Sequence, residues 1–210
     1  MYMRGDYVNS IWAQIIPGQN LLSTDYRYSD LGFIMLRKVV EEVSGMPMNK
    51  FLDDTYYRPM GLYTMTFKPL EKFPLSQIAP TEDDRYFRQQ VLQGDVHDMA
   101  AAMLGGVSGH AGLFSNSIHL ATLMQMLING GTYGGLNYLK PETIKVFTTR
   151  HPGGTRRGLG FDMPQTDWSL TQNVTAKASR ETFGHIGFTG TAVWADPQEK
   201  LVFVFLSNRT

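Results

Sequence analysis

The chain of 210 residues contains no cysteine. Disulfide bonds, thiolate nucleophiles and zinc sites built on cysteine are therefore excluded. The absence does not identify the cellular compartment, because many exported bacterial proteins also lack cysteine.

Long apolar runs and an excess of either charge are missing as well. No run approaches the roughly 20 residues that span a bilayer, and no apolar segment follows Arg4 as it would in a signal peptide. Lysine plus arginine and aspartate plus glutamate both number 19, so the formal net charge is zero. We therefore expect no nucleic-acid partner and no polybasic membrane patch, and any export signal would lie outside this chain.

The residues that are present suffice for a folded core. Hydrophobic residues make up 42% of the chain and aromatic residues 12%, which argues against disorder and favours one domain. The clearest helix follows Asp30 and ends at Gly45. Its apolar positions recur at helical spacing, and its charged positions fall on the other face: Leu31, Ile34, Met35, Val39 and Val43 against Arg37, Lys38, Glu41 and Glu42.

Other segments carry weaker signals. Helices are predicted over 7–16, from Pro47 through Tyr56, within 113–130 and from Pro141, and residues 63–88 are predicted to be loop-rich with short strands. The helix within 113–130 has Ser115, Asn116 and Ser117 as candidate caps. Its predicted buried stripe is Leu120, Leu123, Met124, Leu127 and Ile128.

The C-terminal part reads as a β-hairpin. Residues 192–194 lead into Asp196-Pro197-Gln198-Glu199, a favourable type I turn. Residues 201–206 are apolar at every position, which predicts a strand covered on both faces. Helices followed by a late hairpin indicate an α+β fold, an α/β sandwich.

Two segments are candidates for chemistry. Tyr28-Ser29-Asp30 precedes the long helix. A tyrosine placed there near cations could act as a general base. The alternative is structural, with Ser29 and Asp30 capping the helix. His185 to Thr191 holds a titratable histidine and two glycines, Gly187 and Gly190, that permit a ligand near a strand edge. Its alternative is a glycine-kinked strand with a hydrogen-bonded histidine.

A third segment and the remaining histidines are expected to have structural and not catalytic roles. The segment Gly105–Gly112 fails the G-x-S-x-G pattern because His110 stands where glycine is required, so a tight loop is predicted. No histidine has H-E-x-x-H spacing, so no metal site and no cofactor are expected. Asp83-Asp84 and His97-Asp98 are interpreted as solvated polar turns.

Five segments in this order resemble the serine β-lactamase and penicillin-binding-protein family, in its class C and esterase-like branch. The resemblance starts near Asn20-Leu21-Leu22 and runs to Thr210. Tyr28-Ser29-Asp30 is similar to the family's Y-x-N element and His185-Ile186-Gly187 to its K-T-G element in the H-x-G form. The other three are Pro59-Met60-Gly61-Leu62, Gly112-Leu113-Phe114-Ser115 and Trp194-Ala195-Asp196-Pro197 with the strand after it.

The resemblance implies a fold and a missing part. The fold would be β-lactamase/transpeptidase-like, with residues 1–210 forming a partial domain that has an incomplete antiparallel sheet and a helical lobe. None of the eleven serines has lysine three residues on, so the family's Ser-x-x-Lys nucleophile segment is expected outside this chain. The first strands, the last strand and the C-terminal helix are expected to be missing too.

The resemblance also implies roles. Tyr28 would shuttle a proton, His185 would replace the lysine that sets the electrostatics around Tyr28, and the backbone N–H of Phe188 would form half of an oxyanion hole. Asp30 would contact substrate in place of asparagine, together with Gly187 and Thr189. Because Asp30 is an acceptor and anionic, esters, amides or peptides are favoured over β-lactams.

The expected setting is bacterial and extracytoplasmic or periplasmic. Residues 79–82, 96–98 and 109–114 resemble a subgroup found alone or fused behind glycoside hydrolase modules, which suggests a muropeptide or another small-molecule substrate in cell-wall turnover. The alternative is a non-catalytic module that binds peptidoglycan or a protein partner. A partial sheet with exposed edges also predicts association with itself or with the missing segments.

Overall fold

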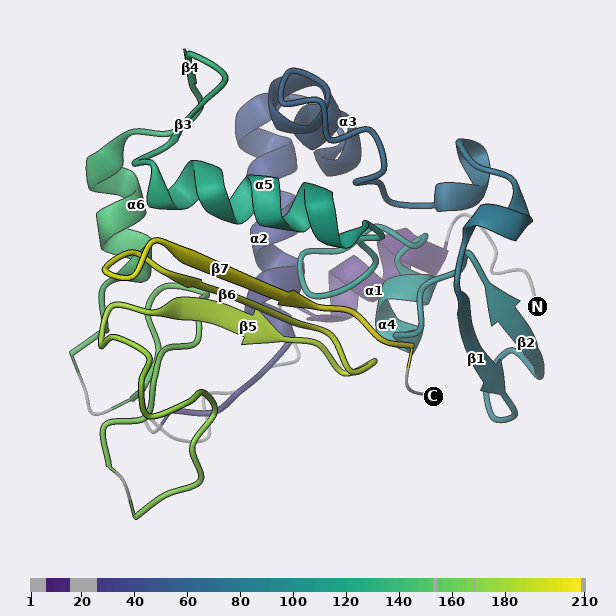
Figure 1. The fold of residues 1–210 in the computed structure, drawn as a ribbon. Coiled ribbons are helices and arrows are strands. Elements are labelled where there is room, and N and C mark those ends of the chain that lie inside the picture. The colour runs from purple at the N-terminus through teal and green to yellow at the C-terminus, as the bar shows by residue number, and fades with distance from the viewer. Residues whose placement is uncertain (1–6, 16–25, 153–154, 168, 209–210) are drawn as a thin grey trace. The chain divides into compact units, whose positions relative to one another are not determined.

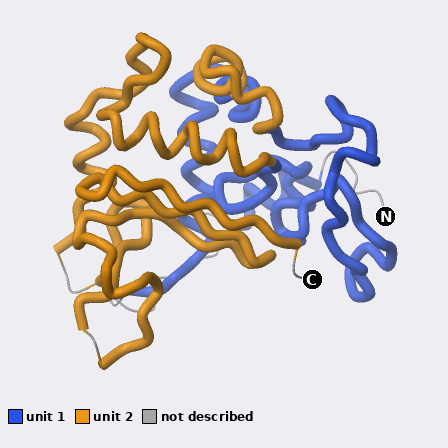
Figure 2. Tube along the Cα trace, in the orientation of Figure 1, with its two compact units in different colours: residues 1–52, 66–114, 210 blue, residues 53–65, 115–209 orange. Residues whose placement is uncertain are grey.

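The computed structural model describes residues 7–152, except 16–25, together with 155–167 and 169–208. It divides into two compact units (Figure 2), which are described in turn. Unit 1 comprises residues 1–52, 66–114 and 210, and unit 2 comprises residues 53–65 and 115–209. The start of the family resemblance, at Asn20-Leu21-Leu22, lies outside the described residues.

Unit 1 is mainly helical. Its α-helices are α1 (Tyr7–Ile15), α2 (Leu31–Ser44), α3 (Met48–Leu52) and α4 (Met99–Met103) (Figure 1). Two short 3-10 helices lie over Pro69–Glu71 and Leu75–Gln77, and a hairpin pairs β1 (Pro80–Asp84) with β2 (Gln90–Gln93). Gly45 ends α2 as predicted, in the left-handed conformation at φ 68°, with its N–H bonded to the carbonyl of Glu41. Part of the core consists of Met48, Phe67 and Val107, with Val40 and Leu52 packed against them.

The buried face of α2 differs from the one its sequence predicts. Ile34 is buried, but Met35, Val39 and Val43 are exposed, the last by 83%. Arg37 and Glu41, expected on the solvent side, form a half-buried ion pair of 3.0 Å. Both side chains also form hydrogen bonds with the backbone. Arg37 donates to the carbonyl of Leu104 at 3.0 Å, and Glu41 accepts from the N–H of Met48 at 3.2 Å. Hydrogen bonding to loops therefore decides which face of this helix is covered.

Unit 2 is a three-stranded sheet with a helix across it. The antiparallel order is β5 (Phe183–Ile186), β6 (Ala192–Asp196) and β7 (Leu201–Phe205). Helix α5 (Ser117–Ile128) lies on β6 and β7 (Figure 1), and Met124 packs there with Phe183 and Ala195. Smaller elements complete the unit: a π-helical turn over Asp53–Tyr57, the pair β3 (Thr132–Tyr133) and β4 (Leu136–Asn137), and α6 (Pro141–Thr148).

The polar turn and cap residues of unit 2 act as the sequence predicts. Asn116 caps α5 by accepting from the N–H of His119 at 2.8 Å. Asp196 accepts from the N–H groups of Gln198 and Glu199 at 3.1 and 3.2 Å, which closes the turn between β6 and β7. The helix predicted from Pro47 to Tyr56 is instead α3 followed by the π-helical turn.

The prediction for the last strand is wrong in one respect. β7 is not covered on both faces, because Leu201, Phe203 and Phe205 are each more than half exposed. It is the outer strand of its sheet, and no other strand of the described residues pairs with its free side. The uninterrupted apolar run therefore indicates a surface that nothing in the described part of the chain covers.

No helix in the described ranges is both long enough and apolar enough to cross a membrane.

Candidate functional site

Tyr28 and Asp30 stand at the entrance of α2 in unit 1. The side chain of Ser29 accepts from the N–H of Leu31 at 3.3 Å, whereas Asp30, at the N-cap position, makes no side-chain capping bond. Tyr28 is 62% exposed and Asp30 is exposed too. The carboxylate of Asp30 is thus not used to cap its own helix.

Asp98 and His110 form a hydrogen-bonded pair beside Asp30. Asp98 Oδ1 accepts from His110 Nε2 at 2.8 Å and from the N–H of Ala101 at 2.7 Å, which makes it the N-cap of α4. The bond from His110 holds the pKa of Asp98 below its usual range, against the effect of partial burial. Interpreting His97-Asp98 as a solvated polar turn is therefore wrong, since Asp98 organises a helix and a loop.

Ser108, His110 and Asp98 are connected in the manner of a catalytic triad. The hydroxyl of Ser108 lies 2.9 Å from His110 Nδ1, opposite the nitrogen that meets Asp98. Ser108 is only 3% exposed, however, so a substrate has no access to its oxygen. The segment Gly105–Gly112 is the tight loop that its sequence predicts, with positive φ at Gly105, Gly106 and Gly112. We assign this chain of hydrogen bonds to holding that loop.

Asp30, Asp98 and His110 are the residues of the described part that could hold a metal ion. Each offers one ligand atom, and the three atoms lie within 4.8 Å of one another. The spacing of the histidines gave no sign of this cluster, because the carboxylates come from distant segments. Both ring nitrogens of His110 already have partners in the protein, so the cluster is organised as a hydrogen-bonded network.

The loop is fitted closely to the first turns of α2. A Cβ atom on Gly109 would lie 2.1 Å from the carbonyl oxygen of Phe33, a distance that only glycine permits. Arg37, one turn further on, donates to the carbonyls of Leu104 and Val107. The helix entrance that carries Tyr28 and Asp30 is therefore anchored to the loop from two directions.

His185 lies on β5 in unit 2 and has a partner at each ring nitrogen. Its Nε2 is 2.7 Å from an N–H of Arg157, and its Nδ1 is 2.6 Å from the carbonyl oxygen of Ile186. In the sheet, His185 is paired with Val193 of β6. Gly184, just before it, must be glycine because a Cβ there would lie 2.1 Å from the carbonyl oxygen of Val193.

After β5 the chain makes a tight turn through the other predicted site residues. The N–H of Gly187 donates to the carbonyl of Thr191 at 2.7 Å. Ser207, just beyond β7, donates to the carbonyls of Gly190 at 2.8 Å and Thr189 at 3.3 Å. Phe188 is 76% exposed at the tip. The role of its N–H in an oxyanion hole stays a prediction.

The predicted site residues thus fall into two groups, each with neighbours that sequence reasoning missed. Tyr28 and Asp30 belong to unit 1, where Asp98 and His110 approach Asp30. The predicted residues on or after β5 belong to unit 2, where Arg157 contacts His185. Arg157 has no local signal, since it lies 28 positions before its partner. The sequence places His110 in a tight loop and Asp98 in a polar turn, but it does not predict the contact between them.

Comparison with known proteins assigns this chain to a family. The family model described as Beta-lactamase matches residues 16–210. Among curated proteins, an Escherichia coli K12 protein named "Putative D-alanyl-D-alanine carboxypeptidase" is 40% identical over 194 residues, which are 87% of this chain and 44% of that protein. A Salmonella gallinarum protein of the same name is 39% identical over 87% of this chain and 45% of its own length. The chain therefore spans less than half the length of these relatives.

Solved structures of low sequence identity share the fold. A penicillin-binding protein homologue from Caulobacter crescentus superimposes with a TM-score of 0.66 at 20% identity, over 96% of this chain and 58% of that one. EstCE1, a hydrolase with promiscuous acyltransferase activity, does so with a TM-score of 0.59 at 20% identity, over 88% and 51%. With the family model covering nearly all of its residues, the chain belongs to the serine β-lactamase and penicillin-binding-protein family and has its α+β fold.

Proposed function

We propose that this chain is part of a serine hydrolase that acts through an acyl-enzyme on an ester, an amide or a peptide of the bacterial cell wall. The observation that carries the proposal is the family match over residues 16–210. Within that range Tyr28-Ser29-Asp30 and His185-Ile186-Gly187 resemble the family's Y-x-N and K-T-G elements. The names of the E. coli and Salmonella relatives support a substrate that ends in D-alanyl-D-alanine.

Each predicted residue has a task in this reaction. The hydroxyl of Tyr28 passes a proton between the nucleophile and the leaving group. The backbone N–H of Phe188 stabilises the oxyanion, and His185 sets the electrostatics around the reacting atoms. Asp30, Gly187 and Thr189 contact the substrate. The nucleophilic serine belongs to the Ser-x-x-Lys segment, which none of the eleven serines of this chain provides.

The carboxylate of Asp30 directs substrate preference. It accepts hydrogen bonds but donates none, and its charge repels an acidic group placed near it. Asp98 adds a second carboxylate within 4.8 Å. This end of α2 therefore suits neutral groups and N–H donors better than a carboxylate, so a substrate carboxylate, whether of a β-lactam or of a terminal D-alanine, is expected to bind away from Asp30.

The test is the intact mass of the full-length protein after incubation with a fluorophosphonate and, separately, with a penicillin. We expect a stable adduct on a serine upstream of Tyr28, and no adduct on this chain alone because covalent catalysis requires the nucleophile. A folded full-length protein that forms no adduct with either reagent would contradict the proposal. That result would favour a module that binds peptidoglycan without chemistry.

A further inference from the structure

The two partners of His185 determine the position of its hydrogen. The guanidinium of Arg157 only donates, so His185 Nε2, 2.7 Å away, must accept. The carbonyl of Ile186 only accepts, so Nδ1, 2.6 Å away, must donate. Both contacts require the same form of the ring, which is neutral and carries its hydrogen on Nδ1.

Arg157 is itself held by a buried carboxylate. Asp162 is 1% exposed, receives a bidentate pair of bonds from Arg156 at 2.6 and 3.0 Å, and lies 3.6 Å from Arg157 Nε. Asp162 also pairs through its backbone with Gly184, by bonds of 2.7 and 3.0 Å. The segment that carries Arg157 is therefore attached to β5 one residue before His185.

The positive charge beside the ring is on Arg157 and not on the ring. Among residues 156–162, Arg156 and Arg157 are cationic and Asp162 is anionic. Across the sheet from His185 stands Val193, which has no charge. A guanidinium stays protonated throughout the physiological range, unlike an imidazole.

We propose that Arg157 is a positioning residue that locks His185 in its neutral, Nδ1-protonated form and supplies the permanent positive charge beside it. The catalytic consequence rests on the proposed function, in which His185 stands in place of the lysine of the family's K-T-G element. Arg157 then provides the positive charge, and His185, bonded at both ring nitrogens, holds the guanidinium in place.

The first test reads the ring directly and needs no activity. Nitrogen-15 NMR of the full-length protein with labelled histidine is expected to show a hydrogen-free Nε2 and a protonated Nδ1 for His185 at pH 7. In Arg157→Met this pattern is expected to give way to a mixture of tautomers, and in Arg157→Lys, which keeps a cationic donor, to persist. Arg85→Met, at an exposed arginine in unit 1, is the control and should leave the His185 signals unchanged.

The second test measures turnover of a simple ester by the full-length protein. Arg157→Met is expected to lower kcat/KM at least about tenfold, chiefly through kcat, because a charged hydrogen bond of this kind contributes at least that much. Arg157→Lys should recover most of the loss, which a purely structural role would not predict. Thermal melting of each variant identifies any that fail to fold.

The outcomes separate this inference from the proposed function. A wild-type His185 with hydrogen on Nε2, or an unchanged ring in Arg157→Met, overturns the role of Arg157 whatever the protein catalyses. A folded full-length protein that forms no adduct with either the fluorophosphonate or the penicillin overturns the hydrolase proposal and leaves the ring measurement to decide the Arg157–His185 contact.

Discussion

Gly109 and Gly32 have opposite surroundings although both belong to the region around α2. A Cβ on Gly109 would meet the backbone carbonyl of Phe33 at 2.1 Å, and a backbone atom in a packed helix has little room to move. A Cβ on Gly32 would meet nothing within 4 Å. The same substitution should therefore have opposite signs at the two positions.

We expect Gly109→Ala to lower the free energy of unfolding by about 1–3 kcal/mol, the usual cost of overpacking. Gly32→Ala, its matched control, should raise it by up to about 1 kcal/mol, because alanine is the better helix former. Urea unfolding followed by circular dichroism measures both. Equal effects from the two variants would mean that the loop does not approach α2 as closely as the structure has it.

Asp30→Asn tests the substrate preference assigned to this carboxylate. Removing the negative charge should raise kcat/KM for a penicillin relative to a neutral ester by about five- to tenfold in the full-length protein, as a charge several ångströms away allows. Asp83→Asn, a similarly exposed aspartate on β1, is the control and should leave the ratio unchanged. An unaltered ratio in Asp30→Asn would show that Asp30 does not face the substrate.

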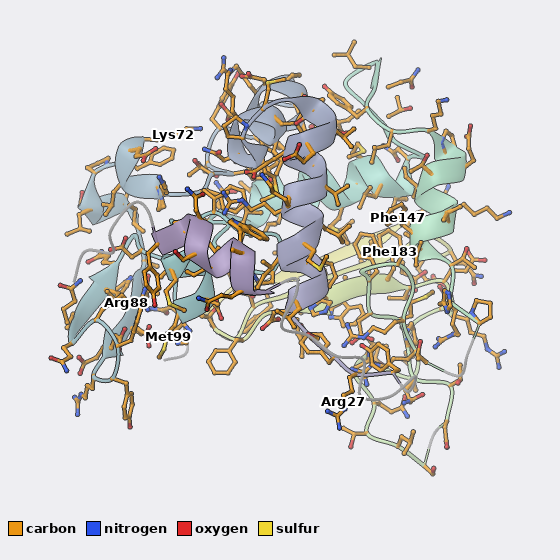
Figure 3. All side chains as sticks on the ribbon, turned by 180° about the vertical axis from the view of Figure 1, so that it is seen from behind. Arg27, Lys72, Arg88, Met99, Phe147 and Phe183 are labelled. Atoms are coloured by element: carbon orange, nitrogen blue, oxygen red, sulfur yellow. The ribbon has the colours of Figure 1, made fainter. Side chains whose placement is uncertain are left out.

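The β1–β2 hairpin is organised by a buried ion pair. Asp84 is 2% exposed and accepts from Arg88 Nε at 2.7 Å and from the backbone N–H of Phe87 at 2.8 Å (Arg88 is labelled in Figure 3). Arg88 also donates to the carbonyls of Val96 and His97. The interpretation of Asp83-Asp84 as a solvated turn is thus wrong for Asp84, which connects the hairpin to the chain that leads into α4.

This pair makes the stability of the hairpin depend on pH. The bond from Arg88, helped by backbone N–H groups, holds the pKa of Asp84 well below its usual range. A lowered folded-state pKa means that the contribution is complete above the unfolded value of about 4 and is lost as the pH falls through the folded value. Asp84→Asn should therefore lower Tm by at least about 5 °C at pH 7.

Thermal melts of wild-type and Asp84→Asn between neutral and acidic pH give the measurement. The difference in Tm should begin to narrow as the pH falls below about 4, where the carboxylate of the unfolded wild-type chain binds a proton, and should vanish once the folded carboxylate is protonated too. Asp83→Asn, whose carboxylate is half exposed, should differ little from wild type at any pH. A gap that is constant with pH would assign the loss to packing instead of charge.

For the molecule as a whole, the uncovered apolar surface of β7 predicts self-association. Phe203 and Phe205 are 53% and 54% exposed on an outer strand, which offers unpaired backbone groups to another chain. Sedimentation of this chain should show oligomers that grow with concentration, and Phe203→Lys should shift them toward monomer. Val91→Lys, at a 71% exposed site in unit 1, is the control. A monomer at high concentration would contradict the expectation.

Local patterns were enough to predict several elements of this fold. The helix that ends at Gly45, the cap at Asn116 and the turn that begins at Asp196 each depend on residues a few positions apart, and the structure confirms these three elements, although the buried face of the helix differs from the predicted one. The order of five short motifs was enough to predict the family, because each motif can be recognised in the sequence without knowledge of the fold.

Contacts between segments far apart in the sequence could not be predicted from such local patterns. Arg37 is partly buried because it donates hydrogen bonds to a loop whose carbonyls lie some 70 positions away. β7 is exposed because no described strand pairs with its free side. Asp98 caps α4 and accepts a hydrogen bond from His110, which lies twelve positions further along the chain. Arg157 contacts His185 because a backbone pairing at Gly184 brings their segments together. A hydrogen bond joins whatever groups the folded chain brings within 3 Å, so its partners follow from the packing of elements and not from the spacing of residues.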